Sequence, residues 1–102
     1  MRTTLLPDAE QELQAAAQWY EQRQQGLGEQ FLETAIAALV SIERHPRRFA
    51  PYAYAPANHE VRRCLLGRFP YGIIYEVRSD ELVILAVAHA VRRPGYWRSR
   101  LP

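Results

Sequence analysis

The fold is decided by the stretch Val61-Arg62-Arg63-Cys64-Leu65-Leu66, followed by Tyr71-Gly72-Ile73-Ile74-Tyr75-Glu76-Val77 and then by Leu82-Val83-Ile84-Leu85-Ala86-Val87-Ala88-His89. These three runs are rich in β-branched, aromatic and aliphatic residues and are separated by short connections, which predicts an antiparallel meander of three strands. Residues 71–77 alternate as expected for a strand with one buried face. Residues 82–88 are apolar on both faces, which predicts a central strand covered on one side by helices.

Working outward from this meander, the N-terminal half predicts a short strand and two helices. Residues 2–6 favour a strand, and apolar residues recur at helical spacing in segments 9–20 and 27–42, with Gly26 as a stop between them. Residues 46–59 contain three prolines and predict an irregular loop. The order β-α-α-β-β-β, with a short C-terminal segment, predicts an α+β fold in which a helical hairpin packs on an antiparallel sheet.

Length and composition restrict the class of protein. The 102 residues suit one domain, 1–102, and the 48% hydrophobic and 24% charged content is that of an ordinary globular protein. No apolar run approaches the roughly 18 residues of a membrane span, and the polar N-terminus has no secretory pattern. The single Cys64 fits a reducing cytoplasm, which is the expected location. Three scattered histidines and one cysteine give no metal-ligand spacing, so no metal or cofactor is expected.

Charge is distributed unevenly along the chain. Residues 1–43 hold two arginines and seven acidic residues, a net charge of −5, whereas residues 44–102 hold eleven arginines and four acidic residues, a net charge of +7. All 13 basic residues are arginine, which stays protonated and binds carboxylate or phosphate through two parallel hydrogen bonds. The C-terminal half is therefore expected to bind an anionic partner.

Candidate binding residues concentrate near the end of the chain, and each has a structural alternative. They are Arg62, Arg63, Arg68, Arg92, Arg93, Tyr96, Trp97 and Arg98. Arg62 and Arg63 alternate across a strand, so only one of them can face a site. Four arginines could bind phosphate, pair with an acidic partner, or pair with glutamates of the helices, namely Arg92, Arg93, Arg98 and Arg100. The terminal aromatic pair could stack on bases or fold back over a core edge. His89 could transfer a proton, or it could be a structural histidine bonded to backbone or to Tyr96.

An ordered set of short motifs resembles the RelE/ParE superfamily of small bacterial toxins from type II toxin–antitoxin systems. The matching pieces span nearly the whole chain and are Ala9-Glu10-Gln11-Glu12-Leu13, Trp19-Tyr20-Glu21, Gly26-Leu27-Gly28, Phe31, Ile42, His45-Pro46, Phe49, Val61-Arg62-Arg63, Phe69-Pro70-Tyr71, Ile74-Tyr75, Val87, His89 and Arg93-Pro94 with Tyr96-Trp97. The resemblance implies a toxin neutralised by a cognate antitoxin, which an adjacent gene would encode.

The superfamily has two chemistries, and the resemblance is closer to the ParE-like members, which bind and poison DNA gyrase. RelE-like members cleave mRNA on the ribosome, and such a nuclease would here use His89 with Arg62, Arg63, Arg93 and Tyr96. Gly72 stands where the nucleases typically carry an arginine, Ala90 follows His89 in place of an aromatic residue, and lysine bases are missing. The expectation is therefore a non-catalytic gyrase poison with no catalytic residues assigned. The alternatives are a ribosome-dependent mRNA endoribonuclease and a non-toxic nucleic-acid-binding module.

Overall fold

The computed structural model describes all 102 residues and contains the predicted elements in the predicted order. They are β1 (Arg2–Leu5), α1 (Pro7–Arg23), α2 (Leu27–Arg44), β2 (Val61–Leu65), β3 (Tyr71–Val77), β4 (Glu81–His89) and a 3₁₀ turn (Arg98–Arg100). The β-α-α-β-β-β order of an α+β fold is thus confirmed, and residues 46–59 form the expected irregular connection. None of the helices combines the length and the apolarity that a membrane crossing requires.

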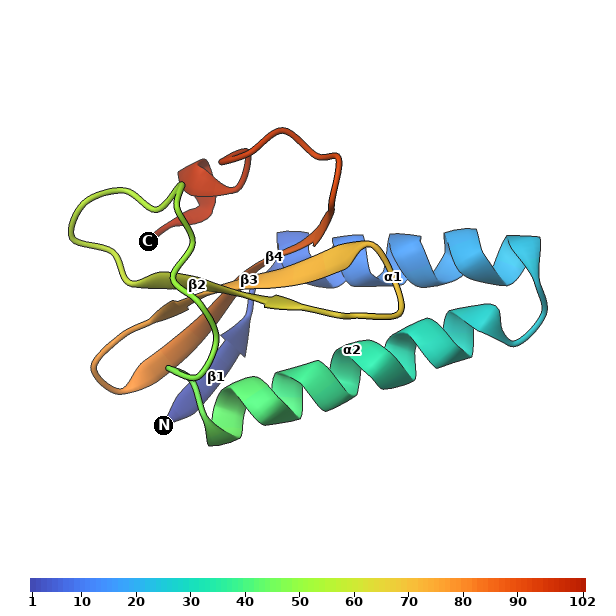
Figure 1. Ribbon diagram of the computed structural model, residues 1–102, viewed down its shortest axis with the longest axis horizontal. Helices are drawn as coiled ribbons and strands as arrows, with labels where there is room; N and C mark the ends of the chain where they lie inside the picture. Colours follow the sequence, from blue (N-terminus) through green and yellow to red (C-terminus); the bar gives the residue numbers. More distant parts are fainter.

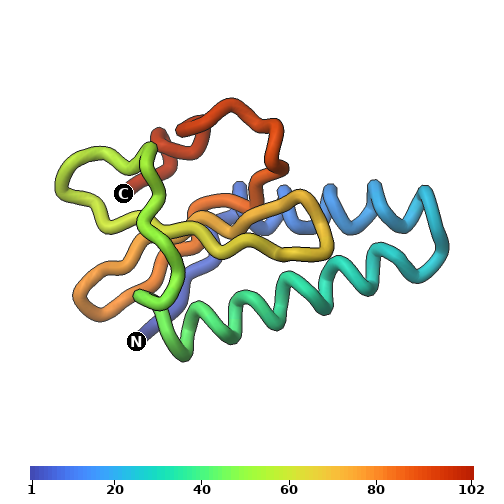
Figure 2. The backbone as a smooth tube through the Cα atoms, viewed as in Figure 1, coloured from blue at the N-terminus to red at the C-terminus, as the bar shows by residue number.

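The four strands form one sheet in the order β1-β4-β3-β2. β4 lies between β1 and β3, as predicted for a central strand, and β1 pairs with it in parallel even though two helices and two strands separate them in sequence. The meander of β2, β3 and β4 is antiparallel. The helical hairpin packs along one face of this sheet, and the C-terminal segment crosses the other face (Figure 1). The tube in Figure 2 shows the last residues returning beside the loop that precedes β2.

The main hydrophobic core fills the space between the helical hairpin and the sheet. The helices contribute side chains including Phe31 and Ile42, and the sheet contributes Ile73, Tyr75 and Ile84, all of them fully buried. The hydroxyl of Tyr75 donates a hydrogen bond of 2.7 Å to the carbonyl oxygen of Pro46, and burial raises the pKa of this phenol to about 12. This contact anchors the start of the irregular connection on the sheet.

The opposite face of the sheet is also buried, which corrects the prediction that β3 has one buried face. Every residue of β3 after Tyr71 is buried. The reason is a second hydrophobic cluster in which the C-terminal segment places Trp97 on the outer face of the sheet. The sheet residues in this cluster are Val61, Ile74, Val83, Leu85 and Ala86. The sheet is therefore the middle layer between the helices and the C-terminal segment.

A β-bulge in β4 leaves Leu85 unpaired with β3, at the position where the C-terminal segment is attached to the sheet. Tyr75 pairs with Ile84 and Ile74 pairs with Ala86, so Leu85 has no partner on β3. β1 pairs with β4 only as far as Ile84, which leaves the next part of that edge of β4 without a neighbouring strand. Side chains of α1 and of the C-terminal segment occupy this edge, as described below.

Candidate binding site

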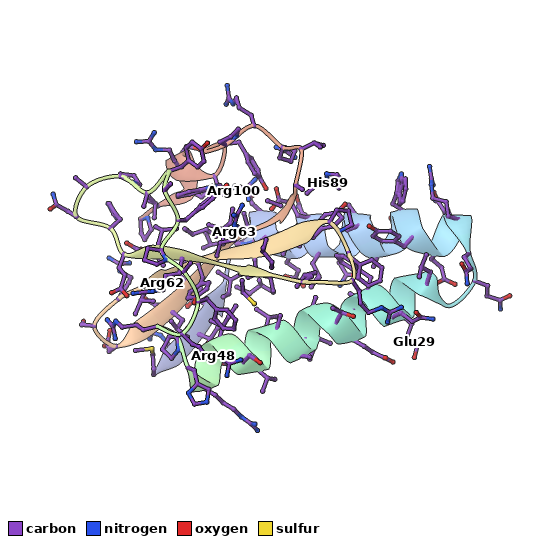
Figure 3. All side chains as sticks on the ribbon, viewed as in Figure 1. Glu29, Arg48, Arg62, Arg63, His89 and Arg100 are labelled. Carbon is purple, nitrogen blue, oxygen red and sulfur yellow. The ribbon has the colours of Figure 1, made fainter.

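A cavity of about 630 Å³ lies on the face of the sheet that the helices do not cover. Its walls come from the loop of residues 51–54, from β2, β3 and β4, from the connection between β2 and β3, and from parts of segment 90–97. A volume of this size is within the range of about 300–1,000 Å³ that is typical of ligand sites. Figure 3 shows Arg63, His89 and Arg100 on the side of the sheet that carries the C-terminal segment, whereas Arg48 lies beside the end of α2.

The cavity is positively charged. Arg63, Arg92 and Arg93 line it together with His89, and no aspartate or glutamate is among its lining residues. The structure thus brings together three of the sequence-predicted arginines, the histidine and the two terminal aromatic residues. Arginine forks in such a setting are suited to bind carboxylate or phosphate groups.

The alternation of Arg62 and Arg63 across β2 is as predicted, and Arg63 is the residue that faces the cavity. Arg62 lies on the other side, where its Nε donates to Glu60 Oε2 at 3.0 Å and its Nη1 donates to the carbonyl oxygen of Phe49 at 2.7 Å. Arg47 also donates to Glu60, and its hydrogen bond is the main cause that lowers the pKa of this carboxylate. Arg62 therefore fastens the loop before β2 and is not part of the cavity.

Gly72 explains how Arg63 reaches its position. A Cβ atom at Gly72 would lie 3.2 Å from both Cγ and Cδ of Arg63, which is closer than ordinary van der Waals contact. The aliphatic part of Arg63 therefore lies over the strand at the place where a side chain of residue 72 would stand. Gly72 on β3 thus leaves room for the side chain of Arg63 from the neighbouring strand β2.

His89 is held in a defined orientation at the end of β4. Its Nδ1 accepts a hydrogen bond of 3.1 Å from the backbone N–H of Val91, and its ring contacts Tyr71 edge to face. Because Nδ1 accepts, the neutral ring carries its proton on Nε2. The partner of His89 is backbone, one of the two structural partners expected from the sequence, and it is not Tyr96.

Tyr96 and Arg100 are both engaged with Glu12 of α1. The Tyr96 hydroxyl donates to Glu12 Oε2 at 2.7 Å, and Arg100 donates to both carboxylate oxygens at 2.9 and 3.0 Å. Glu12 Oε1 also accepts from the backbone N–H of Val87, while Arg100 donates to the carbonyl oxygen of Leu85. Burial, with the hydrogen bond to Glu12, raises the pKa of Tyr96 well above its usual value, and the bond to Glu12 raises the pKa of Arg100. This ion pair takes the place of a strand along the free edge of β4.

The remaining candidate residues have other positions. Trp97 is fully buried in the outer cluster, as expected for an aromatic pair that folds back over the core. Arg68 donates to Gln30 on α2, and Arg98 is exposed; neither lines the cavity. The cavity residues that the sequence did not indicate include Tyr52 and Tyr54 of the proline-containing loop. Their only signal was the presence of two tyrosines in a loop, which does not show what the loop contacts.

Comparisons with known proteins agree with this architecture. The chain matches the family described as the ParE toxin of the type II toxin–antitoxin system parDE over residues 4–94. A solved structure described as a chromosomal ParDE TA system from P. aeruginosa superposes with a TM-score of 0.63 at 20% sequence identity. That match covers 87% of this chain and 95% of the other chain, and it shows a shared fold. No curated protein sequence matches significantly.

The family match over residues 4–94 makes the chain a toxin of the RelE/ParE superfamily. The fold agrees with this class, because a helical hairpin lies on one face of a four-stranded sheet and a basic C-terminal segment lies on the other. Within this class, the chain belongs to the ParE toxin family of type II toxin–antitoxin systems.

Proposed function

We propose that this toxin acts by binding and poisoning DNA gyrase without catalysis, and that a cognate antitoxin neutralises it. The observation that carries the proposal is that His89 and Tyr96, the side chains of the site that could accept a proton from a substrate, are already engaged in hydrogen bonds. His89 already uses Nδ1 to accept from Val91, and its Nε2 carries the proton in the neutral ring. The Tyr96 hydroxyl donates to Glu12. A cleavage reaction at the 2′-hydroxyl of RNA needs a free base within hydrogen-bonding distance, so this arrangement favours binding over cleavage.

The test combines two assays on the purified chain. We expect dose-dependent inhibition of supercoiling by DNA gyrase, or accumulation of cleaved DNA with gyrase bound. We expect no cut in the mRNA of programmed ribosomes under the same conditions. Codon-positioned mRNA cuts together with unaffected supercoiling would contradict the proposal.

A ribosome-dependent ribonuclease is the second candidate, and one observation favours it. Arg63, Arg92, Arg93 and His89 line one cavity, and cations beside a histidine are the groups that a phosphoryl-transfer reaction uses. This candidate requires His89 to turn away from the N–H of Val91 when the substrate binds. The ribosome assay decides between the two candidates because only the nuclease cleaves.

We expect the antitoxin to bind through an acidic segment, because unpaired arginines gather in the C-terminal half. Charge complementarity accelerates encounter more than it increases affinity, so the association rate should fall as the salt concentration rises. The measurement is the association rate of the product of the adjacent gene between about 50 and 500 mM NaCl, which changes the screening length roughly threefold. An association rate that does not change with salt would contradict this prediction.

A further inference from the structure

The three arginines of the cavity differ from the paired arginines elsewhere in the chain. Arg47 and Arg62 are paired with Glu60, and Arg100 is paired with Glu12. Arg63, Arg92 and Arg93 have no carboxylate within 4 Å, although the chain contains eleven acidic side chains. Their hydrogen-bond donors are therefore free to bind an external anion.

Two of these guanidinium groups are already oriented by aromatic rings. Cζ of Arg63 lies 4.5 Å from the centre of the Tyr52 ring, and Cζ of Arg92 lies 3.9 Å from the centre of the Tyr96 ring. In a contact of this kind the aromatic ring attracts the flat face of the guanidinium group, and the N–H groups at the edge of the guanidinium stay free to donate hydrogen bonds. Because Tyr96 is itself bonded to Glu12, the position of Arg92 is tied to α1. Arg63 and Arg92 are exposed, but these ring contacts restrict them, so they lose less freedom on binding an anion than exposed arginines without such contacts would.

The surroundings of the arginines favour a peptide over a nucleic acid. Arginines already lie over Tyr52 and Tyr96, and Trp97 is fully buried, so Tyr54 is the one exposed ring of the cavity left for a base, whereas single-strand binding uses rings for successive bases. The cavity is instead bordered by exposed apolar groups, because Leu65 is 65% exposed and Tyr54 is 48% exposed. A ligand that carries an apolar side chain beside a carboxylate would be complementary to unpaired arginines bordered by exposed apolar groups.

We propose that the cavity binds a peptide segment in which acidic and apolar residues alternate, and that this segment belongs to the antitoxin. Its carboxylates pair with Arg63 and Arg92, and its apolar side chains cover Leu65 and Tyr54. Gly72 contributes by leaving room for the side chain of Arg63. This inference rests on the proposed neutralisation by an antitoxin and assigns it to the outer face of the sheet.

The first test is an NMR titration of the ¹⁵N-labelled full chain that follows the Nε–H signals of the arginines. The probes are the capped peptide acetyl-Leu-Glu-Leu-Glu-Leu-Glu-amide, the same peptide with glutamine at each glutamate, and hexathymidylate. We expect the acidic peptide to shift the signals of Arg63 and Arg92 and to leave those of Arg98, an exposed arginine outside the cavity, unchanged. The absence of a shift, or stronger binding of the neutral peptide or the oligonucleotide, would overturn the proposal.

The second test uses the antitoxin encoded beside the gene. Arg63→Gln and Arg92→Gln should each raise Kd by about tenfold, the loss of a charged hydrogen bond, whereas Arg98→Gln should change it less than about twofold. Arg63→Lys keeps the positive charge but loses the guanidinium group that can donate two parallel hydrogen bonds. Its Kd for the antitoxin should therefore lie between the values of the wild type and Arg63→Gln. If the antitoxin binds all variants equally and still rescues growth, this inference alone is wrong. If the antitoxin neither binds nor rescues the wild type, the proposed function also fails.

Discussion

Trp97 illustrates at the scale of one residue how the C-terminal segment is held to the sheet. It is fully buried in the outer cluster, stacks with Tyr52 at 5.9 Å between ring centres, and its indole N–H has no hydrogen-bond partner. A buried donor without a partner costs free energy, so the contribution of Trp97 to stability comes from its apolar surface.

We therefore expect Trp97→Phe to be much milder than Trp97→Ala. Phenylalanine keeps an aromatic ring and removes the unpaired donor, so the free energy of unfolding should fall by less than about 1.5 kcal/mol. Alanine leaves a cavity and should cost about 3–5 kcal/mol. Urea denaturation of both variants measures the two values. Equal losses would show that the apolar ring surface is not what holds the segment.

Through Glu60, the stability contributed by the loop before β2 depends on pH. Its pKa is lowered from 4.5, chiefly by the hydrogen bond from Arg47, so its stabilising contribution is complete above the unfolded-state value and is lost as the pH falls through the folded-state value. Because Glu60 and Arg47 are partly exposed, we expect this contribution to be about 1 kcal/mol or less.

The check is the difference in unfolding free energy between the wild type and Glu60→Gln, measured from pH 7 down to pH 3. The difference should be constant near neutral pH and should shrink below about pH 4.5. The exposed Glu29, which forms no ion pair, provides the control variant Glu29→Gln. A difference between wild type and Glu60→Gln that grows as the pH falls would contradict the assignment.

At the scale of an element, the C-terminal segment is part of the fold because α1 and β4 together hold it. Glu12 accepts from Val87, Tyr96 and Arg100, and Arg100 is only 15% exposed at its side chain. The bulge at Leu85 provides the carbonyl oxygen that Arg100 also binds. The segment thereby covers the outer face of the sheet and forms one wall of the cavity.

We expect Glu12→Gln to destabilise the protein by about 3 kcal/mol, because it leaves the largely buried charge of Arg100 without its principal partner. Amide hydrogen exchange should increase most in residues 96–101, since their attachment to α1 is weakened. Glu10→Gln, an exposed position on the same helix, is the matched control and should be close to neutral. Equal thermal stability of the two variants would show that the ion pair does not hold the segment.

At the scale of the whole molecule, local patterns in the sequence predicted the elements and, as one of two alternatives, the return of the terminal aromatic pair over the core, but not the burial of the outer face of β3. Apolar periodicity and the positions of glycine and proline indicate both helices and the meander, because these signals depend on neighbouring residues. Burial of the outer face of β3 depends on Trp97, more than twenty residues further along the chain. Such a contact between distant segments leaves no periodic signal in either of them.

The candidate site was predictable to the extent that its residues lie near one another in sequence. Arg63, His89, Arg92 and Arg93 follow from the meander and its last turn, and the alternation in β2 correctly separates Arg62 from Arg63. Pairing of a C-terminal arginine with a glutamate of the helices was one of the alternatives from the sequence, and Arg100 forms this pair with Glu12. The choice of Glu12 and the contact of Tyr52 could not be foreseen, because α1 and the irregular loop approach the C-terminal segment only in the folded chain.

The charge asymmetry is only partly neutralised within the molecule. Arg100 pairs with Asp8 and Glu12 of the acidic half, whereas the three arginines of the cavity remain unpaired. The unpaired charge is therefore available to a partner, as the proposed function requires.

The most direct test of binding without proton transfer is the growth arrest caused by His89→Gln. Glutamine can accept from the N–H of Val91 through its side-chain oxygen, so the turn after β4 should be kept, and circular dichroism with thermal melting checks the fold. We expect expression of the folded variant to arrest growth as strongly as the wild type, with gyrase inhibition unchanged. A folded His89→Gln protein that no longer arrests growth, with a rate of mRNA cleavage reduced by about 10²–10⁴ relative to a cleaving wild type, would contradict the account.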